Sequence, residues 1–527
     1  MRIQGCQLRP TLGDISHNLA LATTEIQRST ADIMVFSELF LTGYPSTDRL
    51  FLNGMETAVA SAIDTLLVLS QTFSGLIIMG TPYFDGQHWR NAALAMAQGN
   101  VIHRHFKICL PTHDIFNDAR YFVAGTMVAP FIWRGTSLAM LICEDAWGPS
   151  QRYPMDPIQM LGNHAIDHVI HLTASPFDRY KPQQRVKIIS AMSTTLASPV
   201  ISVNQVGGYA DILFDGQSMA TNALGQVVDS WAAFTPMVRN FKAASPRSCP
   251  PVGWDGIFNA MIFGLKEYMK ATGLSSVLVG MSGGIDSALV ALLAVHALGA
   301  AQVQLVTMPT IYNAQETQAD AQDMADRLGC RMIRRPIEPH RLAVGKDVAQ
   351  ALNVPALSSL TDQNIQARLR GLLLMSMANQ TGALLLTTGN KSELAMGYAT
   401  LYGDMCGGLN PIGDLFKTEV AALMAHLADK TGQVPVTILS RPPSAELAFD
   451  QRDDDVLPPY DQLDPILEAY MIKKQSVADI GVTYGLETVS SVIQRLHRNE
   501  FKRYQSPPIL KLSPQSFGPG WQFPLVT

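Results

Sequence analysis

The sequence has few cysteines, and none of them form a closely spaced pair. Its 527 residues include six cysteines, and no two of these make a Cys-X-X-Cys motif. A disulfide framework is therefore not expected. Residues 1–4, Met-Arg-Ile-Gln, do not resemble the start of a signal peptide. We expect reduced thiols and a cytoplasmic location.

Long apolar segments and basic runs are missing as well. The apolar runs at 138–142 and 277–279 are far shorter than the roughly 20 residues that a membrane-spanning helix needs. The formal net charge is −5, with the two signs interspersed, which gives no electrostatic footprint for nucleic acid or for an anionic membrane. We therefore expect no nucleic-acid or membrane partner and favour small-molecule substrates.

The sequence does contain enough apolar material for two cores. Hydrophobic residues make up 47% of the chain and charged residues 16%, as in compact enzymes. Because domains usually run to about 100–250 residues, we expect two of them. Residues 241–253 concentrate Pro, Ser and Ala without apolar periodicity, which is typical of a linker. We therefore place the domains at 1–245 and 246–527.

Both parts alternate short apolar runs with amphipathic stretches, which predicts an α/β fold. In the second part the alternation favours a doubly wound, Rossmann-like parallel sheet, with glycines ending its helices at 299, 329 and 382. The predicted strands are 33–36, 76–79, 138–142, 168–172 and 200–203 in the first part, and 277–279, 303–308, 332–334 and 383–386 in the second. The predicted helices are 18–28, 185–196, 287–298, 315–328 and 365–381.

A glycine-rich loop at 280–287 joins an apolar strand to an Ala/Leu-rich helix. The first amides of such a helix are unpaired and bind anions. Gly283 and Gly284 allow close approach, while Ser282 and Ser287 offer hydroxyls to phosphate oxygens. An ordinary strand-to-helix turn is the alternative, but two serines and an aspartate around the glycines argue against it.

This loop lacks the Gly-Lys-Ser/Thr ending of a Walker A motif, so cations must come from elsewhere, and Lys391, Lys417 and Lys502 are candidates. The loop resembles the SGGxDS motif of the N-type ATP pyrophosphatases. That resemblance implies ATP as a co-substrate, cleaved between its α and β phosphates.

The rest of the second part resembles NAD synthetase. The motifs that carry the resemblance are NIQARLR at 364–370, GNKSE at 389–393, LYGD at 401–404, PIGDLFKT at 411–418, PPSAEL at 442–447, LPPY at 457–460 and NEFKRYQSPP at 499–508. The resemblance implies that the nicotinate carboxylate of deamido-NAD is adenylated and then attacked by ammonia. The products would be NAD, AMP and pyrophosphate. Mg²⁺ is an expected cofactor, because pyrophosphate leaves poorly until its charge is neutralised.

The same resemblance implies roles for individual residues. One departure is TIYNAQ at 310–315, where the family has a serine-rich stretch, and this puts that loop's role in gating ATP in doubt. The implied ATP-binding residues are Gly280, Met281, Ser282, Gly283, Gly284, Ile285, Asp286, Ser287, Thr388 and Lys417. Those implied for deamido-NAD are Asn364, Glu393 and Lys502, and those for the metal are Asp286 and Glu393.

The first part contains the components of an amide hydrolase that could supply ammonia. Glu38, Lys107 and Cys143 each follow the end of an apolar run, and the carboxyl ends of strands converge on one rim of a wound sheet. Such chemistry needs a thiolate nucleophile, a base and a cation for the oxyanion. We assign Cys143, Glu38 and Lys107 to these roles in that order, although a lone buried cysteine is otherwise more often inert.

Three segments around these residues resemble the nitrilase superfamily: SELFLTGYP at 37–45, FKICLP at 106–111 and LICEDAW at 141–147. The resemblance covers roughly residues 1–240 and implies an αββα sandwich. ASPFDRYK at 174–181 matches the family's glutamine-binding segment, so Ser175 and Lys181 are implied substrate contacts. His113 stands where the family has Tyr, and a structural role and a glutamine contact are equally open for it.

Two neighbouring features lack such support. Cys109 has no motif match, and we assign it no role. The His103/His105 alternation resembles a metal pair, but no carboxylate or cysteine with suitable spacing accompanies it. A half-exposed strand is the better prediction there.

Together, the two resemblances indicate the glutamine-dependent NAD synthetase family, carbon–nitrogen ligases with glutamine as the amide donor. The expected small-molecule partners are L-glutamine, ATP and deamido-NAD, and we expect a homo-oligomer. One alternative is an ammonia-dependent NAD synthetase whose first domain is a non-catalytic scaffold. Another is a GMP or asparagine synthetase, but those lack the GNKSE and LPPY motifs.

Overall fold

The computed structural model describes residues 1–147, 153–242 and 244–525. Its internal contacts divide the chain into two compact units. The first comprises Met1–Tyr209 and Leu213–Val252, and the second comprises Ala210–Ile212 and Gly253–Thr527. Among the described residues, no helix is both long enough and apolar enough to cross a membrane.

The first unit contains two six-stranded mixed sheets, with strand orders β14-β1-β2-β3-β4-β5 and β13-β12-β9-β8-β7-β6. In each sheet three neighbouring strands run parallel, β1-β2-β3 in one and β7-β8-β9 in the other. The first sheet comprises β1 (Ile3–Gln7), β2 (Ile33–Phe36), β3 (Leu76–Phe84), β4 (Trp89–Ala97), β5 (Asn100–Phe106) and β14 (Met237–Asn240). The second comprises β6 (Phe131–Trp133), β7 (Thr136–Ile142), β8 (His168–Thr173), β9 (Val200–Asn204), β12 (Met219–Thr221) and β13 (Val227–Ser230). A separate pair is formed by β10 (Val206–Tyr209) and β11 (Ile212–Asp215).

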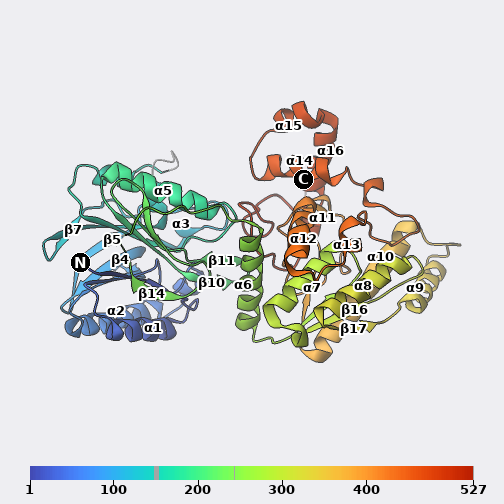
Figure 1. Cartoon of the computed structure of the whole chain (residues 1–527), viewed down its shortest axis with the longest axis horizontal. Coiled ribbons are helices and arrows are strands. Elements are labelled where there is room, and N and C mark those ends of the chain that lie inside the picture. Colours follow the sequence, from blue (N-terminus) through green and yellow to red (C-terminus); the bar gives the residue numbers. More distant parts are fainter. Residues whose placement is uncertain (148–152, 243, 526–527) are drawn as a thin grey trace. The chain divides into compact units, whose positions relative to one another are not determined.

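These sheets pack face to face with helices outside them (Figure 1). Alternate residues of each strand point inward, so Val35, Ile78, Met140 and Leu172 share one core between the sheets. The helices of this unit are α1 (Ile15–Arg28), α2 (Met55–Thr72), α3 (Asp118–Tyr121), α4 (Pro157–Leu161) and α5 (Lys181–Leu196). Helix α2 contacts β3 and β4, whereas α5 contacts β9 and β12. This confirms the predicted αββα sandwich.

The second unit is built on a four-stranded sheet of order β17-β16-β15-β18, and all of its strand pairs are parallel. Both faces are covered: Leu278 and Leu385 pack with α10 residues, and Val277 and Val279, which alternate with Leu278, are also fully buried. The strands are β15 (Val277–Gly280), β16 (Val303–Thr307), β17 (Arg331–Arg334) and β18 (Leu384–Leu386). The predicted doubly wound parallel sheet is confirmed.

The helices of the second unit include a C-terminal group where no helices were predicted. Helices α11, α14, α15 and α16 share a core of their own, which includes Leu463, Ile466, Val492 and Leu496. The helices are α6 (Trp254–Thr272), α7 (Ile285–Leu298), α8 (Gln315–Leu328), α9 (Glu338–Ala351), α10 (Ser359–Thr381), α11 (Lys391–Met396), α12 (Lys417–Thr431), α13 (Val436–Ser440), α14 (Tyr460–Met471), α15 (Val477–Tyr484), α16 (Leu486–Arg498) and α17 (Glu500–Arg503).

Candidate active sites

Cys143 lies at the end of β7, where the chain turns sharply into the short 3₁₀ helix η2 (Cys143–Trp147). Its φ of 43° falls in the left-handed region, which residues with a side chain rarely adopt and which is retained mostly at functional sites. Nε2 of His171 donates to the Cys143 carbonyl oxygen at 3.0 Å, and the Thr173 hydroxyl donates to Sγ at 3.3 Å. The thiol is therefore held in one place in a strained turn.

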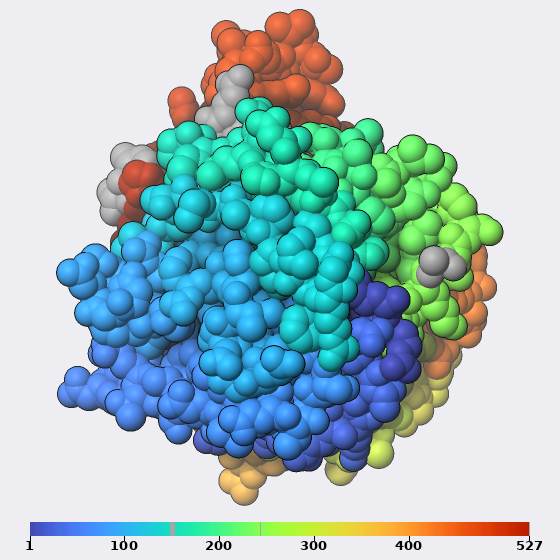
Figure 2. Space-filling model, turned by 90° about the vertical axis from the view of Figure 1, so that its left-hand side faces the viewer, coloured from blue at the N-terminus to red at the C-terminus, as the bar shows by residue number. Residues whose placement is uncertain are grey.

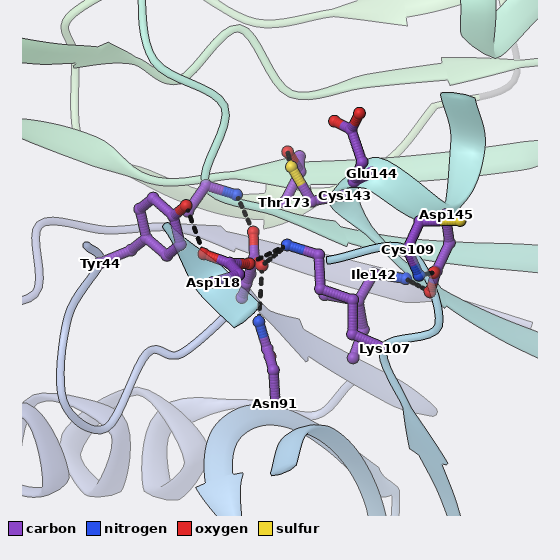
Figure 3. A network of polar contacts seen from close by, with 12 residues as sticks. Tyr44, Asn91, Lys107, Cys109, Asp118, Ile142, Cys143, Glu144, Asp145 and Thr173 are labelled. Carbon is purple, nitrogen blue, oxygen red and sulfur yellow. Dashed lines mark hydrogen bonds and ion pairs between the residues drawn. The ribbon is translucent and has the colours of Figure 1, made fainter. Parts of the chain in front are cut away.

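Glu38 follows β2, so it comes from the other sheet. Sequence reasoning had placed the three residues on one rim; instead, Glu38 and Cys143 extend from two sheets that face each other. Oε1 of Glu38 accepts from Lys107 Nζ at 2.7 Å and from Asn91 Nδ2 at 2.8 Å, while Oε2 of Glu38 accepts from the Ala174 amide at 3.0 Å. Figure 3 shows this network beside Cys143 and Thr173.

Lys107 follows β5 and is only 1% exposed. Its Nζ forms a second ion pair with Asp118 Oδ2 at 2.7 Å, and the Tyr44 hydroxyl donates to Asp118 Oδ1 at 2.9 Å. Sequence reasoning missed Asp118. A signal was present, because a buried lysine requires nearby anions and Asp118 begins the next helix after Lys107.

The electrostatics of this network follow from its burial. Burial raises the pKa of Glu38, and the positive charge of Lys107 opposes that rise only in part. Burial and the charge of Glu38 raise the pKa of the Cys143 thiol. Burial alone would lower the pKa of Lys107, but Asp118 and Glu38 outweigh it and hold the pKa well above its usual value. The resting network thus combines a protonated thiol, a carboxylate of raised basicity and a permanent cation.

This network is enclosed. Cys143 is 6% exposed and Glu38 0%, so both lie beneath the surface of the first unit, one face of which Figure 2 shows in blue to green. Low exposure strengthens each of these charge interactions, since little water screens them.

The three candidate glutamine contacts occupy different surroundings. The Ser175 amide donates to Asn204 Oδ1 at 2.9 Å. Lys181 Nζ lies 4.2 Å from the centre of the Trp147 ring, and burial lowers its pKa. The His113 ring packs edge-on against Phe116 with centroids 5.5 Å apart.

In the second unit the glycine-rich loop connects β15 to α7, as predicted. Gly283 has φ 90°, and a Cβ there would lie 2.1 Å from the Thr317 carbonyl oxygen, so only glycine fits. The hydroxyls of Ser282 and Ser287 are 3.0 Å apart. The Met281 amide donates to the Val306 carbonyl at 2.8 Å, which anchors the start of the loop to the sheet.

A cavity of about 640 Å³ opens above this loop. It is lined by every candidate residue of the second unit except Lys391 and Gly283, and Gly283 packs against the Thr317 carbonyl behind the loop. The candidate residues that line it are Gly280, Met281, Ser282, Gly284, Ile285, Asp286, Ser287, Asn364, Thr388, Glu393, Lys417 and Lys502.

Two carboxylates of this cavity are suited to a divalent cation. Asp286 forms an ion pair with Lys417, and Glu393 Oε1 lies 3.9 Å from the same ammonium group. Burial and the charge of Asp286 raise the pKa of Glu393 to about 8, and a divalent cation beside this carboxyl group would favour its ionised form. Among the described residues no three His, Cys, Asp or Glu side chains gather as a complete metal site. Mg²⁺ bound by these two carboxylates would take its remaining oxygens from phosphate and water, as it prefers to do.

The other candidates in this unit have local partners. Asn364 Oδ1 accepts from the Thr400 hydroxyl at 2.8 Å, and Lys502 Nζ donates to the carbonyls of Gly397 and Ala399 at 2.7 and 2.8 Å. Lys391 was wrong as a candidate phosphate cation. It is fully buried, and its Nζ binds Asp414 at 2.7 Å, because the α11 turn that carries it packs inward.

A hydrolase-like sandwich with a Cys–Glu–Lys network, joined to a parallel-sheet unit with a glycine-rich loop, defines a two-domain enzyme of the amide-transferring class. Residues 3–237 match the carbon–nitrogen hydrolase family and residues 257–506 match the NAD synthase family.

Full-length relatives agree with both matches. The chain is 36% identical to a glutamine-dependent NAD(+) synthetase of Synechocystis, with 99% of this chain and 97% of the relative covered. It is 38% identical to the Rhodobacter capsulatus protein of the same name, with 100% and 98% covered. A solved structure of the Acinetobacter baumannii glutamine-dependent NAD+ synthetase with ADP is 30% identical, with a TM-score of 0.78 and 99% and 98% of the two chains covered. The chain belongs to the glutamine-dependent NAD(+) synthetase family.

Proposed function

We propose that this chain hydrolyses L-glutamine in its first unit and uses the ammonia in its second unit to convert deamido-NAD to NAD. The observation that carries the proposal is the buried contact network of Glu38 and Lys107 beside the strained Cys143. A scaffold domain would have no use for a buried ion pair next to a cysteine in a rare backbone conformation.

In the proposed glutaminase reaction, Glu38 takes the Cys143 proton as the sulfur attacks the glutamine amide carbon. The Lys107 ammonium stabilises the developing oxyanion. Glu38 then returns the proton to the departing nitrogen, which leaves as ammonia and gives a thioester. Water, deprotonated by Glu38, cleaves the thioester, releases glutamate and restores the thiol.

Ser175, Lys181 and His113 are proposed to bind glutamine around this network. The assignment of Lys181 is supported by its position over Trp147. This contact restricts the conformation of both side chains, and they would hold the carboxylate end of the substrate. The assignment of His113 is supported by its contact with Phe116. The Phe116 ring also lies 6.3 Å from the ring of Tyr44, which donates to Asp118 and so leads to the Lys107 network.

In the proposed synthetase reaction, the loop at 280–287 with Thr388 and Lys417 binds ATP, and Asn364, Glu393 and Lys502 bind deamido-NAD. The nicotinate carboxylate attacks the α phosphate and displaces pyrophosphate. Ammonia then attacks the acyl carbon of the adenylate, and AMP leaves. Mg²⁺ held by Asp286 and Glu393 would neutralise the pyrophosphate leaving group. The single cavity that these residues line is the support for this assignment.

Three broader points belong to the same proposal. We keep functional domains at 1–245 and 246–527, a cytoplasmic location and a homo-oligomeric state. The six cysteines are all unpaired, in keeping with a reducing compartment. On α9 and α10, Leu342, Leu360 and Leu372 are exposed, as residues covered by a second copy would be in an isolated chain.

The test is the Cys143→Ala variant of the full chain. NAD formation from glutamine should fall by at least about 10³-fold, while NAD formation from ammonium salts should stay near the wild-type rate. Equal loss with both nitrogen sources would reject this division of labour. Wild-type protein that uses ammonia but releases no glutamate from glutamine would instead establish a non-catalytic first unit.

A further inference from the structure

One buried carboxylate connects the two segments that carry Lys107 and Cys143. Asp145 is 0% exposed. Its Oδ1 accepts from the amides of Ile108 and Cys109, both at 2.9 Å. Its Oδ2 accepts from the amide of Ile142 at 3.0 Å. The first two amides follow Lys107 directly and the third precedes Cys143, so one side chain fixes both backbones (Figure 3).

The bonds to Asp145 reach across the sandwich. Lys107 follows β5 of one sheet, whereas Cys143 follows β7 of the other. Burial alone would raise the pKa of Asp145, but the hydrogen bond from His105 and those from backbone amides hold it below its usual value. Asp145 is thus an ionised acceptor, which makes its hydrogen bonds stronger than those of a neutral group.

The remaining bond to Asp145 comes from His105, whose Nε2 lies 2.8 Å from Oδ2. His105 is two residues before Lys107 on β5 and therefore points to the same face of the sheet. Its ring is 2% exposed, and Nδ1 has no hydrogen-bond partner among the described residues. Because a carboxylate can only accept, Nε2 carries the hydrogen of this bond, and Asp145 is the group that the ring orients.

We propose that His105 is a positioning residue of the glutaminase reaction, which fixes Asp145 so that the Lys107 and Cys143 backbones keep one relative position. The inference rests on the proposed glutaminase function of this unit. His105 touches neither the thiol nor Lys107 Nζ. Without its bond, Oδ2 keeps only the Ile142 amide, and the carboxylate can rotate away from the amides that follow Lys107.

Substitutions of His105 by Asn and Gln, whose side chains differ in length, test this inference. Gln places its amide nitrogen near the position of Nε2 of His, whereas Asn places it near Nδ1 and cannot reach Asp145. His105→Asn should lower glutaminase kcat by about 10- to 100-fold, the size expected for misplacing a reacting group by about 1 Å. The KM for glutamine should change little, because the substrate contacts remain. His105→Gln should recover most of the activity.

His103 provides the matched control. It lies on the same strand and face as His105, but its ring stacks on Phe131 at 4.5 Å and has no bond to Asp145. His103→Asn should leave glutaminase kcat unchanged. Ammonia-driven NAD synthesis should be unchanged in all three variants, which reports that the second unit is intact, while glutaminase activity recovered in His105→Gln reports that the first unit tolerates a substitution at this position.

A second readout separates this inference from the function on which it rests. Alkylation of Cys143 by iodoacetamide, followed by mass spectrometry, needs no glutamine turnover. His105→Asn should slow it relative to wild type and His105→Gln. Wild-type protein without glutaminase activity would reject the proposed function. The alkylation rates would still show whether His105 positions Cys143. Equal kcat, or equal alkylation, in the Asn and Gln variants would overturn the inference.

Discussion

At the scale of single residues, the most informative feature of the first unit is a lysine held between two carboxylates. Lys107 contacts Glu38 and Asp118, each at 2.7 Å, and all three side chains are almost fully buried. A lone carboxylate would be neutralised by one lysine, whereas two leave a net negative charge beside the thiol. Asp118 therefore keeps Lys107 charged and leaves Glu38 able to accept a proton.

Replacing Asp118 by the isosteric Asn tests this arrangement. The pKa of Lys107 should fall, because Asp118 is the foremost of the charges that raise it, and Glu38 would become the sole anionic partner. We expect a glutaminase kcat about 10- to 100-fold lower, since oxyanion stabilisation depends on a correctly placed cation. Initial rates of glutamate release measure it.

Asp48→Asn is the control for that experiment, because Asp48 pairs with Arg120 in an exposed ion pair of the kind that contributes little. It should behave as wild type. If Asp118→Asn keeps the wild-type kcat, Lys107 needs only Glu38, and the two-carboxylate account is incorrect.

The sequence anticipated some of these residues and not others, for a physical reason. Glu38, Lys107 and Cys143 were predicted because each stands at the end of an apolar run, which is a local pattern. The roles assigned to them remain predictions. Asp118 and Asn91 were not foreseen, because their positions depend on pairings such as Tyr44 with Asp118, 74 positions apart. The burial of Lys391 was hidden for the same reason, since Asp414 and Ser513 reach it from distant segments.

At the scale of elements, strands and their ends were predictable, whereas the packing of the C-terminal helices against one another was not. Apolar runs gave β2, β7, β8, β15 and β16 close to their observed positions, because a buried strand needs only a few consecutive apolar residues. Helices α14 to α16 bury their apolar stripes against α11 and against one another. The buried residues Val489, Val492, Ile493 and Leu496 of α16 recur at helical spacing, so this helix was detectable, whereas its packing against α11 and α14 joins segments far apart in the chain.

The turn between β15 and α7 gives a prediction for one element. Gly283→Ala should abolish NAD synthesis with either nitrogen source, because the added Cβ would meet the Thr317 carbonyl oxygen at 2.1 Å and the loop must shift. Glutamate release in the first unit should continue. Assays of both half-reactions on the same preparation measure the split.

Gly273→Ala is the matched control for this substitution. Gly273 also has a positive φ, of 71°, but a Cβ there meets nothing within 4 Å. It should cost about 1 kcal/mol of stability and leave synthesis intact. Loss of synthesis in both variants would mean that backbone strain, and not the close fit of Gly283 against Thr317, is responsible.

The link between β5 and β7 predicts a pH-dependent contribution to stability. The pKa of Asp145 is lowered in the folded state, so its contribution is present above the unfolded pKa of about 3.9 and is lost as pH falls through the folded pKa. Asp145→Asn should therefore destabilise the first unit by about 3 kcal/mol at pH 7.

As pH falls from about 4 through the lowered folded pKa of Asp145, the stability gap between Asp145→Asn and wild type should narrow, because Asp145 then becomes protonated and neutral, as Asn is. Denaturant titrations read out by pulse labelling of Cys109 and Cys143, both in this unit, would measure it. Asp32→Asn, at a partly exposed site that accepts from the Arg2 amide, should show no such trend. A gap that stays constant with pH would indicate that shape rather than charge is lost.

At the scale of the whole molecule, each proposed reaction has its own compact unit. The Cys143 network belongs to the first unit and the glycine-rich loop at 280–287 to the second, so we expect that each can be inactivated without affecting the other. Carrying both on one chain keeps the ammonia source at a high effective concentration relative to its consumer. At neutral pH this matters, because ammonia released to solvent is mostly protonated and no longer nucleophilic.

A mixture of Cys143→Ala and Gly283→Ala chains tests whether ammonia passes directly to the second unit. The mixture contains one intact copy of each proposed site, on different chains. If ammonia passes within a chain, glutamine-driven NAD synthesis by the mixture should be at least about 10-fold slower than by wild type, as expected when a local source is replaced by a diluted one. Wild type should form glutamate, AMP and NAD in equimolar amounts even with an enzyme that scavenges free ammonia. If the mixture makes NAD from glutamine as fast as wild type, and the scavenging enzyme abolishes this synthesis, ammonia travels through solvent.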